Sequence, residues 1–269
     1  MPRTKKKNDR KLLIQWIAAL SAVLAVMVCI SLLLQPRPTE DPPEETTAAP
    51  RPTTSSEEFV YDDFGFLTCT TRPSIPGIDV SHHQGGIDWQ QVADAGVEFA
   101  FIRLGYRGYK DGLLHADEQA RANLEGARSA GLKIGGYMFS QALTTQEAEE
   151  EAAFALEILG DTQLDLPLVF DWEYVSDTAR TANVTEKTLM ACVEAFCTAV
   201  EAAGAEPMVY FNQDLANTRL DLEKLDYPFW LAKYTDNLNY PHKIRCWQYT
   251  DQGRIPGISE DVDIDLYFP

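Results

Sequence analysis

From residue 75 onward, short apolar runs alternate with longer segments in which apolar and polar residues recur at helical spacing. Runs of this length are consistent with buried strands. We expect eight strands, at residues 76–81, 99–106, 132–140, 166–173, 207–212, 228–234, 244–250 and 261–268.

The segments between the early runs carry the signals of helices. Most of them combine good helix formers with apolar residues at i, i+3 and i+4. We expect helices within residues 89–96, 116–131, 144–160 and 185–204, and a shorter one within 212–225. Thr144 and Thr185 stand where N-terminal caps are expected. Gly131, Gly160 and Gly204 suit helix C-termini.

The order of these elements favours a closed α/β barrel. Helices follow the early strands, whereas after the fifth strand they shorten and then disappear. This order predicts a TIM-like (β/α)5(β)3 barrel of parallel strands, with an open, doubly wound sheet as the alternative. In such a barrel, chemistry is expected at the C-terminal ends of the strands.

The N-terminal region predicts a membrane anchor. Residues 12–34 are apolar and uncharged, and about 20 such residues suffice to cross a bilayer as a helix. The basic residues in 1–11 predict that this tail is cytoplasmic and that the rest of the chain is extracellular. A cleavable signal peptide is the alternative, but its apolar core has only about 7–15 residues. A lipoprotein signal would use Cys29, which Val28 precedes where a small residue is expected.

Composition divides the remainder into a linker and a domain. Residues 35–74 are expected to be an extracellular linker, since residues 35–58 are rich in Pro, Thr and Glu and have little to bury. Nearer the domain, Tyr61 and Phe64 either pack on it or remain free. Residues 75–269 would form one monomeric domain. The formal net charge of −18 argues against nucleic acid as a partner, because a phosphate-binding surface needs clustered Lys and Arg.

Neither the cysteines nor the histidines have the spacing of a metal site. Outside the apolar stretch the cysteines are Cys69, Cys192, Cys197 and Cys246, with no Cys-x-x-Cys pair, and buried thiols are expected. His82 and His83 are adjacent without further ligands nearby, which is more typical of a loop surface.

Polar residues occur in or at the ends of several expected strands. They are Asp79, Asp171, Glu173, Asn212, Gln248, Asp263 and Asp265. Aromatic residues accompany them: Tyr137, Phe139, Trp172, Tyr210, Trp230, Tyr234, Trp247 and Tyr249. Carboxylates ringed by aromatic faces suit a sugar, whose C–H faces stack on rings and whose hydroxyl groups need acceptors.

Asp171 and Glu173 form the most informative pair. Residues i and i+2 of a strand face the same side, about 6.6 Å apart along the chain. Like charges at this distance raise the pKa of one partner, and a carboxyl group held protonated near neutrality can protonate a leaving oxygen. We assign the proton to Glu173, at the rim, and the anion to Asp171. An isolated Asp-x-Glu is more often a solvated strand end or a helix cap, so the interpretation depends on the whole set of residues.

Eight motifs together resemble the glycoside hydrolase family 25 muramidases, the Chalaropsis-type lysozymes. The motifs are GIDVSHHQGGIDW (77–89), AFIRLGY (100–106), GGYMFS (135–140), LVFDWE (168–173), VYFN (209–212), WLAKY (230–234), CWQYT (246–250) and GISEDVDID (257–265). The resemblance implies a modified barrel of eight strands and five helices. It also implies hydrolysis of the β-1,4 bond between N-acetylmuramic acid and N-acetylglucosamine in peptidoglycan, without a metal or cofactor. The predicted location is then the bacterial cell membrane, with the catalytic domain extracellular.

The family's roles are implied for individual residues of this chain. Glu173 matches the general acid, and Asp171 matches the residue that assists the acetamido group of the substrate as nucleophile. Asp79 and Asp263 match residues lining the site. Tyr137, Tyr210, Trp230 and Gln248 match positions near the sugar.

Two departures from the family pattern leave alternatives open. Met138 stands where His is frequent, and Asp265 stands where Asn is common, so we expect altered substrate contacts. A non-catalytic wall-binding module and a glycosidase of other specificity, such as a chitinase-like enzyme, are the competing functions.

Overall fold

The computed structural model describes residues 58–269, which belong to one folded unit. The predicted basic tail (1–11), apolar span (12–34) and most of the predicted linker lie outside the described residues. Among the helices of residues 58–269, none is both long and apolar enough to cross a membrane.

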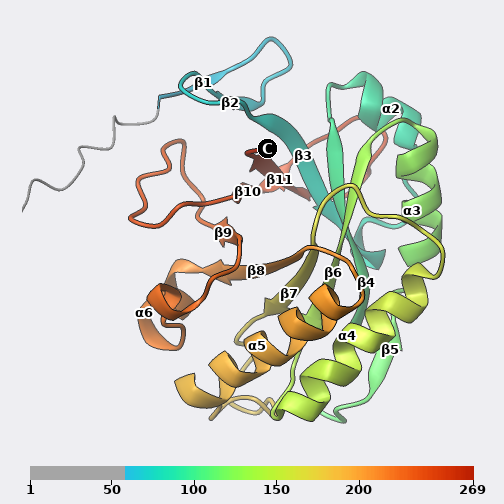
Figure 1. Ribbon diagram of the computed structural model, residues 1–269. Helices are drawn as coiled ribbons and strands as arrows, with labels where there is room; N and C mark the ends of the chain where they lie inside the picture. The colour runs from blue at the N-terminus through green and yellow to red at the C-terminus, as the bar shows by residue number, and fades with distance from the viewer. Residues whose placement is uncertain (1–57) are drawn as a thin grey trace, which may run out of the picture. The chain divides into compact units, whose positions relative to one another are not determined.

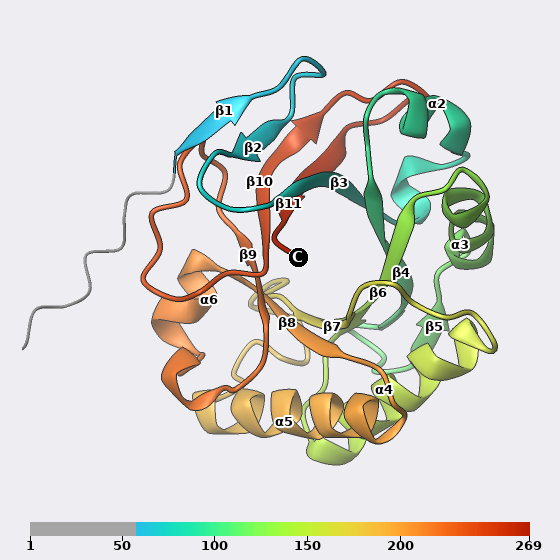
Figure 2. The same ribbon diagram turned by 45° about the horizontal axis from the view of Figure 1, so that its top comes forward.

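Eight strands close into a barrel, seen along its axis in Figure 2. They are β3 (Ile75–Val80), β4 (Phe99–Arg107), β6 (Lys133–Ser140), β7 (Leu168–Trp172), β8 (Pro207–Asn212), β9 (Phe229–Ala232), β10 (Cys246–Gly253) and β11 (Val262–Tyr267). Pairing of β3 with both β4 and β11 closes the ring, so the barrel prediction is confirmed and the open sheet is excluded. Each of the eight predicted strands corresponds to one of these strands.

The direction of the last strand differs from the prediction of a parallel barrel. β11 runs antiparallel to both of its neighbours, whereas the other barrel strands are mutually parallel. The reason is the short connection between β10 and β11, residues 254–261, because a parallel crossover needs about a dozen residues or more. As a result, the N-terminal part of β11 lies at the same rim as the C-terminal ends of the other strands.

Helices cover the outside of the barrel (Figure 1). They are α2 (Trp89–Asp94), α3 (Ala120–Ser129), α4 (Thr145–Leu159), α5 (Glu186–Ala202) and α6 (Gln213–Thr218), with a 3-10 turn, η2, at Leu222–Lys224. The hydroxyl groups of Thr144 and Thr185 accept hydrogen bonds from the first turns of α4 and α5, as predicted. Gly131, Gly160 and Gly204 follow their helices at positive φ, a conformation that glycine adopts without steric cost.

The apolar residues form two layers, one inside the barrel and one between strands and helices. Inside, Phe99 and Phe101 fill the space left by two glycines. A Cβ atom on Gly77 would lie 2.2 Å from the Phe99 ring, and one on Gly135 would lie 2.2 Å from the Phe101 ring. Phe101 stacks on Trp230 at a centroid distance of 4.7 Å. The interior is therefore filled below the rim, which leaves open space only at the rim.

A hairpin that the sequence analysis assigned to the linker packs on the barrel. It consists of β1 (Phe59–Tyr61) and β2 (Leu67–Cys69). Leu67 is buried, and its amide donates to the hydroxyl of Tyr249 in β10 at 3.3 Å. Within the described residues, this hairpin therefore packs on the domain, and the boundary predicted at residue 75 falls after it. Seven of the eleven residues 59–69 are apolar or aromatic, but Asp62, Asp63 and Gly65 divide them into short pieces, so no continuous apolar run indicated a strand. Tyr61 and Phe64 themselves remain exposed.

Two further features complete the domain. A short strand, β5 (Leu114–Ala116), extends the sheet beside β4, and a 3-10 turn, η1 (His82–Gln84), follows β3. The four cysteines of the described residues, Cys69, Cys192, Cys197 and Cys246, are free and buried, as expected.

Candidate active site

A cleft of about 220 Å³ opens at the rim where the parallel strands end. All eight residues to which the family resemblance assigns a role line it: Asp79, Asp171, Glu173, Asp263, Tyr137, Tyr210, Trp230 and Gln248. A larger hollow of about 510 Å³ lies beside α6, but its lining includes none of these eight. The chemistry of the lining, rather than the volume, therefore marks the candidate site.

Strand β7 determines which side chains reach the cleft. Asp171 faces inward and is 5% exposed, whereas Trp172 points to the opposite face and is buried between strands and helices. The register pairs Asp171 with Phe139 of β6 and Tyr210 of β8, so aromatic residues flank it on both sides. Glu173 is the first residue beyond β7 and also lines the cleft.

A chain of hydrogen bonds organises the opposite wall. Asp79 of β3 faces Asp263 of β11 in the antiparallel register. The Gln248 amide donates to Oδ2 of Asp79 at 2.8 Å. The hydroxyl groups of Tyr210 and Tyr234 donate to Oε1 of the same Gln248, at 3.3 and 3.1 Å. One amide therefore orients a carboxyl group and two phenols.

The two departures from the family pattern, Met138 and Asp265, do not line the cleft, so an effect on substrate contacts would have to pass through their neighbours. Asp265 is fully buried beneath it, where its Oδ1 accepts a hydrogen bond from Trp230 Nε1 at 2.8 Å. Met138 is fully buried in the layer between strands and helices. Strand alternation turns Met138 away from the cleft, and Asp265 affects the site only through neighbours such as Trp230.

Burial raises the pKa values of the clustered acids. Burial, and then the nearby charge of Asp263, raises the pKa of Glu173 to about 7. Burial and Asp251 raise the pKa of Asp263 to about 6. Burial also raises the pKa of Asp171 well above its usual range, with the charge of Glu173 as the next cause. Burial is thus the larger cause of the raised pKa values, whereas the sequence indicated only repulsion between Asp171 and Glu173.

Asp79 is an additional proton site. Its pKa is raised well above the usual range, first by burial and then by the charges of Asp263 and Asp265, while the hydrogen bond from Gln248 lowers it. Several acids share a small volume, so protons remain on some of them near neutrality.

The cleft also has lining residues that were not predicted from the sequence, of which Arg103 is the most informative. Arg103 of β4 contributes a positive charge, and its guanidinium pairs with Asp117 at 2.8 Å. A charged residue in the middle of an apolar run was the available signal. His83 also lines the cleft, while His82 contacts Asp117 at 3.1 Å, so the pair is not simply loop surface. Phe139, Tyr234, Ser81 and Gln84 complete the lining.

Within the described residues, no group of three or more His, Cys, Asp or Glu side chains could hold a metal ion. The lining of the cleft offers carboxyl groups, an arginine, amides and aromatic rings. An eight-stranded α/β barrel with two carboxyl groups in a cleft lined by aromatic rings is the arrangement of a barrel glycoside hydrolase.

Comparison with known proteins supports that class. Residues 78–258 match the model of Glycosyl hydrolases family 25, and the chain belongs to this family. The uncharacterized protein YegX of Escherichia coli K12 is 31% identical over 203 residues, covering 72% of this chain and 70% of YegX. An autolytic lysozyme of Clostridium acetobutylicum is 27% identical over 192 residues, covering 71% of this chain and 55% of that lysozyme.

Among solved structures, the modular autolysin LytC of Streptococcus pneumoniae has a TM-score of 0.66 and 26% identity. The similarity covers 79% of this chain and 50% of LytC, so this chain matches about half of that modular protein. LytC has also been solved in complex with a synthetic peptidoglycan ligand.

Proposed function

We propose that this chain is a membrane-anchored extracellular N-acetylmuramidase, which hydrolyses the β-1,4 bond between N-acetylmuramic acid and N-acetylglucosamine in peptidoglycan. The observation that carries the proposal is the pair Asp171 and Glu173 in one aromatic cleft, with the pKa of Glu173 raised to about 7. The autolytic lysozyme among the relatives and the peptidoglycan ligand of LytC support the substrate class.

In the proposed reaction, Glu173 is the general acid. Its raised pKa keeps the carboxyl group protonated near neutrality, so it can give its proton to the glycosidic oxygen as the C–O bond breaks. The leaving sugar departs with a new hydroxyl group. The resulting carboxylate then takes a proton from the incoming water, which restores the acid for the next turnover.

Asp171 is the proposed partner of the substrate's acetamido group. Its Oδ1 is buried and has no hydrogen-bond partner within residues 58–269, so it can accept the acetamido N–H. That bond would direct the acetamido oxygen at the anomeric carbon, forming a cyclic intermediate that water opens with net retention. Asp79 and Asp263 would line the sugar site. Tyr137, Tyr210, Trp230 and Gln248 would supply stacking faces and hydrogen bonds.

The two competing functions make different demands on the cleft. A wall-binding module would not need an acid with a raised pKa beside a second carboxyl group, so the pair favours an enzyme. A chitinase-like specificity would leave a different sugar at the new reducing end. Analysis of the products therefore distinguishes these functions.

Residues 12–34 are the proposed single-pass anchor, with the tail 1–11 cytoplasmic. The apolar length and the flanking basic residues support this assignment. An anchored chain would remain with membranes after washing in alkaline carbonate, and external protease would release the domain. Release of the intact chain by carbonate would contradict the anchor.

The test of the catalytic proposal is product analysis on purified cell walls, with Glu173→Gln as the comparison variant. We expect the wild type to produce muramic acid reducing ends, detectable by mass spectrometry after borohydride reduction. Glu173→Gln should lower turnover at least about 100-fold, the scale of losing a general acid, while leaving the melting temperature at or above that of the wild type. Unchanged turnover in the variant would place the acid elsewhere, and no new reducing ends from the wild type would favour a binding module.

A further inference from the structure

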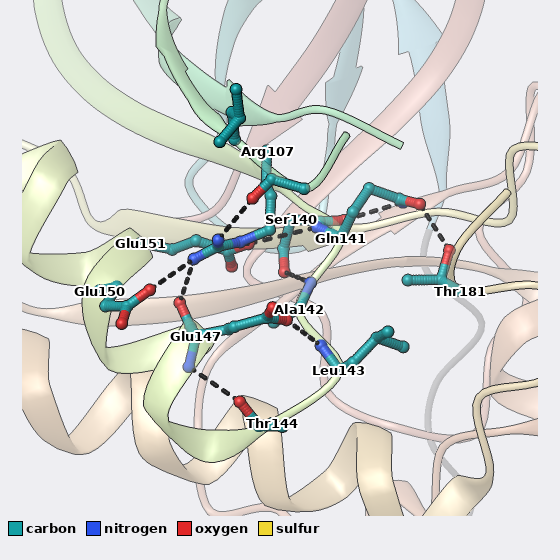
Figure 3. Close-up of polar contacts among 12 residues, drawn as sticks. Arg107, Ser140, Gln141, Ala142, Leu143, Thr144, Glu147, Glu150, Glu151 and Thr181 are labelled. Atoms are coloured by element: carbon teal, nitrogen blue, oxygen red, sulfur yellow. Dashed lines mark hydrogen bonds and ion pairs between the residues drawn. The ribbon is translucent and has the colours of Figure 1, made fainter. Parts of the chain in front are cut away.

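The side chain of Gln141 connects the backbone of Glu173 to Thr181, which lies in the loop after β7. Gln141 is the first residue after β6, and it is fully buried. Its side-chain amide donates to the backbone carbonyl oxygens of Ser140 at 2.9 Å and Glu173 at 3.0 Å. Its Oε1 accepts a hydrogen bond from the hydroxyl of Thr181, as Figure 3 shows.

The chemistry of the partners determines the orientation of this amide. The two carbonyl oxygens can only accept, so the NH2 group of Gln141 must face them. Its oxygen must then face Thr181, whose hydroxyl donates. A carboxylate, an apolar side chain or a reversed amide could not make the same set of bonds.

The surrounding residues hold Gln141 firmly in place. Its backbone amide donates to Oε1 of the buried Glu151 at 3.3 Å, and that carboxylate also accepts from Nε of Arg107 at 2.8 Å (Figure 3). Its carbonyl oxygen accepts from Arg180 at 2.9 Å, and Arg180 also pairs with both oxygens of Glu147 at 2.6 and 3.0 Å. The network thus attaches β6, α4 and the loop 173–185 to one another.

Glu173 needs such support more than its neighbours do. It lies beyond the end of β7, so the barrel ladder does not hold it. Within residues 58–269, no protein group forms a hydrogen bond with its carboxyl group. Asp171, Asp263, Tyr210 and Tyr234 interact with this carboxyl group electrostatically. None of these four side chains forms a hydrogen bond with the backbone of Glu173.

We propose that Gln141 and Thr181 are positioning residues, which hold the backbone of Glu173 so that its carboxyl group stays at the depth in the cleft required for proton donation. This role rests on the proposed function of Glu173 as the general acid. The pair touches no substrate and acts only through the backbone of Glu173 and the loop. Loss of the Thr181 hydroxyl would leave Oε1 of Gln141 without its hydrogen bond. The Gln141 side chain could then rotate, and the backbone of Glu173 would move toward solvent.

Thr181→Val in the full-length chain tests the proposal, because valine keeps the shape of threonine and removes only the hydroxyl. We expect kcat to fall about tenfold with KM within twofold of the wild type, since displacement by a fraction of an ångström already weakens proton transfer. The alkaline limb of the pH–rate profile should move to lower pH as the carboxyl group becomes hydrated. Thr181→Ser should restore both properties, and Gln141→Leu should reproduce the defect of Thr181→Val.

Thr178→Val is the matched control, since this exposed threonine lies in the same loop and its hydroxyl contacts Ser176 rather than Gln141. It should leave kcat and the pH profile unchanged. A lower melting temperature for Thr181→Val, with wild-type kcat and an unmoved alkaline limb, would overturn the positioning role. Glu173→Gln in the same assay separates the two proposals: if that variant retains full turnover, the general-acid assignment fails whatever Thr181→Val does.

Discussion

At the scale of single residues, burial raises the pKa of both acids of the Asp171–Glu173 pair. Glu173 and Asp171 both lie in the cleft, but Glu173 is nearer the rim, where a leaving oxygen would stand. Burial favours the neutral carboxyl group, and the charge of Asp263 adds to that preference. The positive charge of Arg103 acts on Asp171 in the opposite direction and favours its ionised form, which suits the different roles proposed for the two carboxyl groups.

This arrangement predicts the pH dependence of the reaction. A general acid must be protonated, and its protonated fraction falls as the pH rises through its pKa of about 7. We expect kcat/KM to decline above about pH 7, by about tenfold per pH unit, in a pH–rate profile on soluble glycan. Asp263→Asn should shift that alkaline limb to lower pH, because it removes a negative charge that raises the pKa of Glu173.

Asp261→Asn is the control for this shift. Asp261 is exposed and pairs with Arg254 at 2.7 Å, so the same substitution two residues earlier removes a charge outside the cleft. An alkaline limb that moves equally in both variants would show that overall charge, rather than Asp263, controls the acid.

At the scale of elements, hydrophobic periodicity located all eight barrel strands, because each buries a continuous apolar run. Thr144 and Thr185 marked helix starts because their hydroxyl groups satisfy otherwise unpaired amides. The direction of β11 was missed, since pairing direction depends on connection length rather than on side chains. Arg103 was missed because an isolated charge in a strand does not reveal that Asp117 will neutralise it.

Helix α3 offers a test in which packing opposes helix propensity. Gly126→Ala should stabilise an isolated helix by about 1 kcal/mol. In the folded domain, however, the new Cβ atom would lie 2.2 Å from the Trp89 ring of α2. We expect net destabilisation of about 1–3 kcal/mol, measured by urea unfolding, because the ring must move out of a packed position.

Ser129→Ala provides the comparison on the same helix, since Ser129 is exposed and its substitution changes propensity without packing. It should be neutral or slightly stabilising. Stabilisation of the domain by Gly126→Ala would contradict this prediction. It would show that α2 and α3 can move apart without cost, so that the Trp89 ring does not require a glycine at position 126.

At the scale of the whole molecule, the acids of the cleft should make the stability of the domain fall as the pH rises. Asp79, Asp171, Glu173, Asp263 and Asp265 all have raised pKa values, with burial as the first cause of each. A carboxyl group whose pKa is higher in the folded state binds its proton more tightly there than in the unfolded chain. Stability is therefore lost as the pH rises from the unfolded value through the folded value. Asp117 and Glu147 have lowered pKa values, so their stabilising contribution is lost only at more acidic pH.

We therefore expect the melting temperature to fall steadily as the pH is raised from about 5 to about 8, measured by scanning calorimetry at constant ionic strength. Glu173 alone accounts for a shift from 4.5 to about 7, on the order of 3 kcal/mol in the free energy of unfolding. Glu173→Gln should reduce the slope of stability against pH and raise stability at pH 8. Glu157→Gln, at an exposed position of α4, should leave that slope unchanged. A wild-type melting temperature that is constant or rises over this range would show that the cleft acids ionise in the folded state as readily as in the unfolded chain.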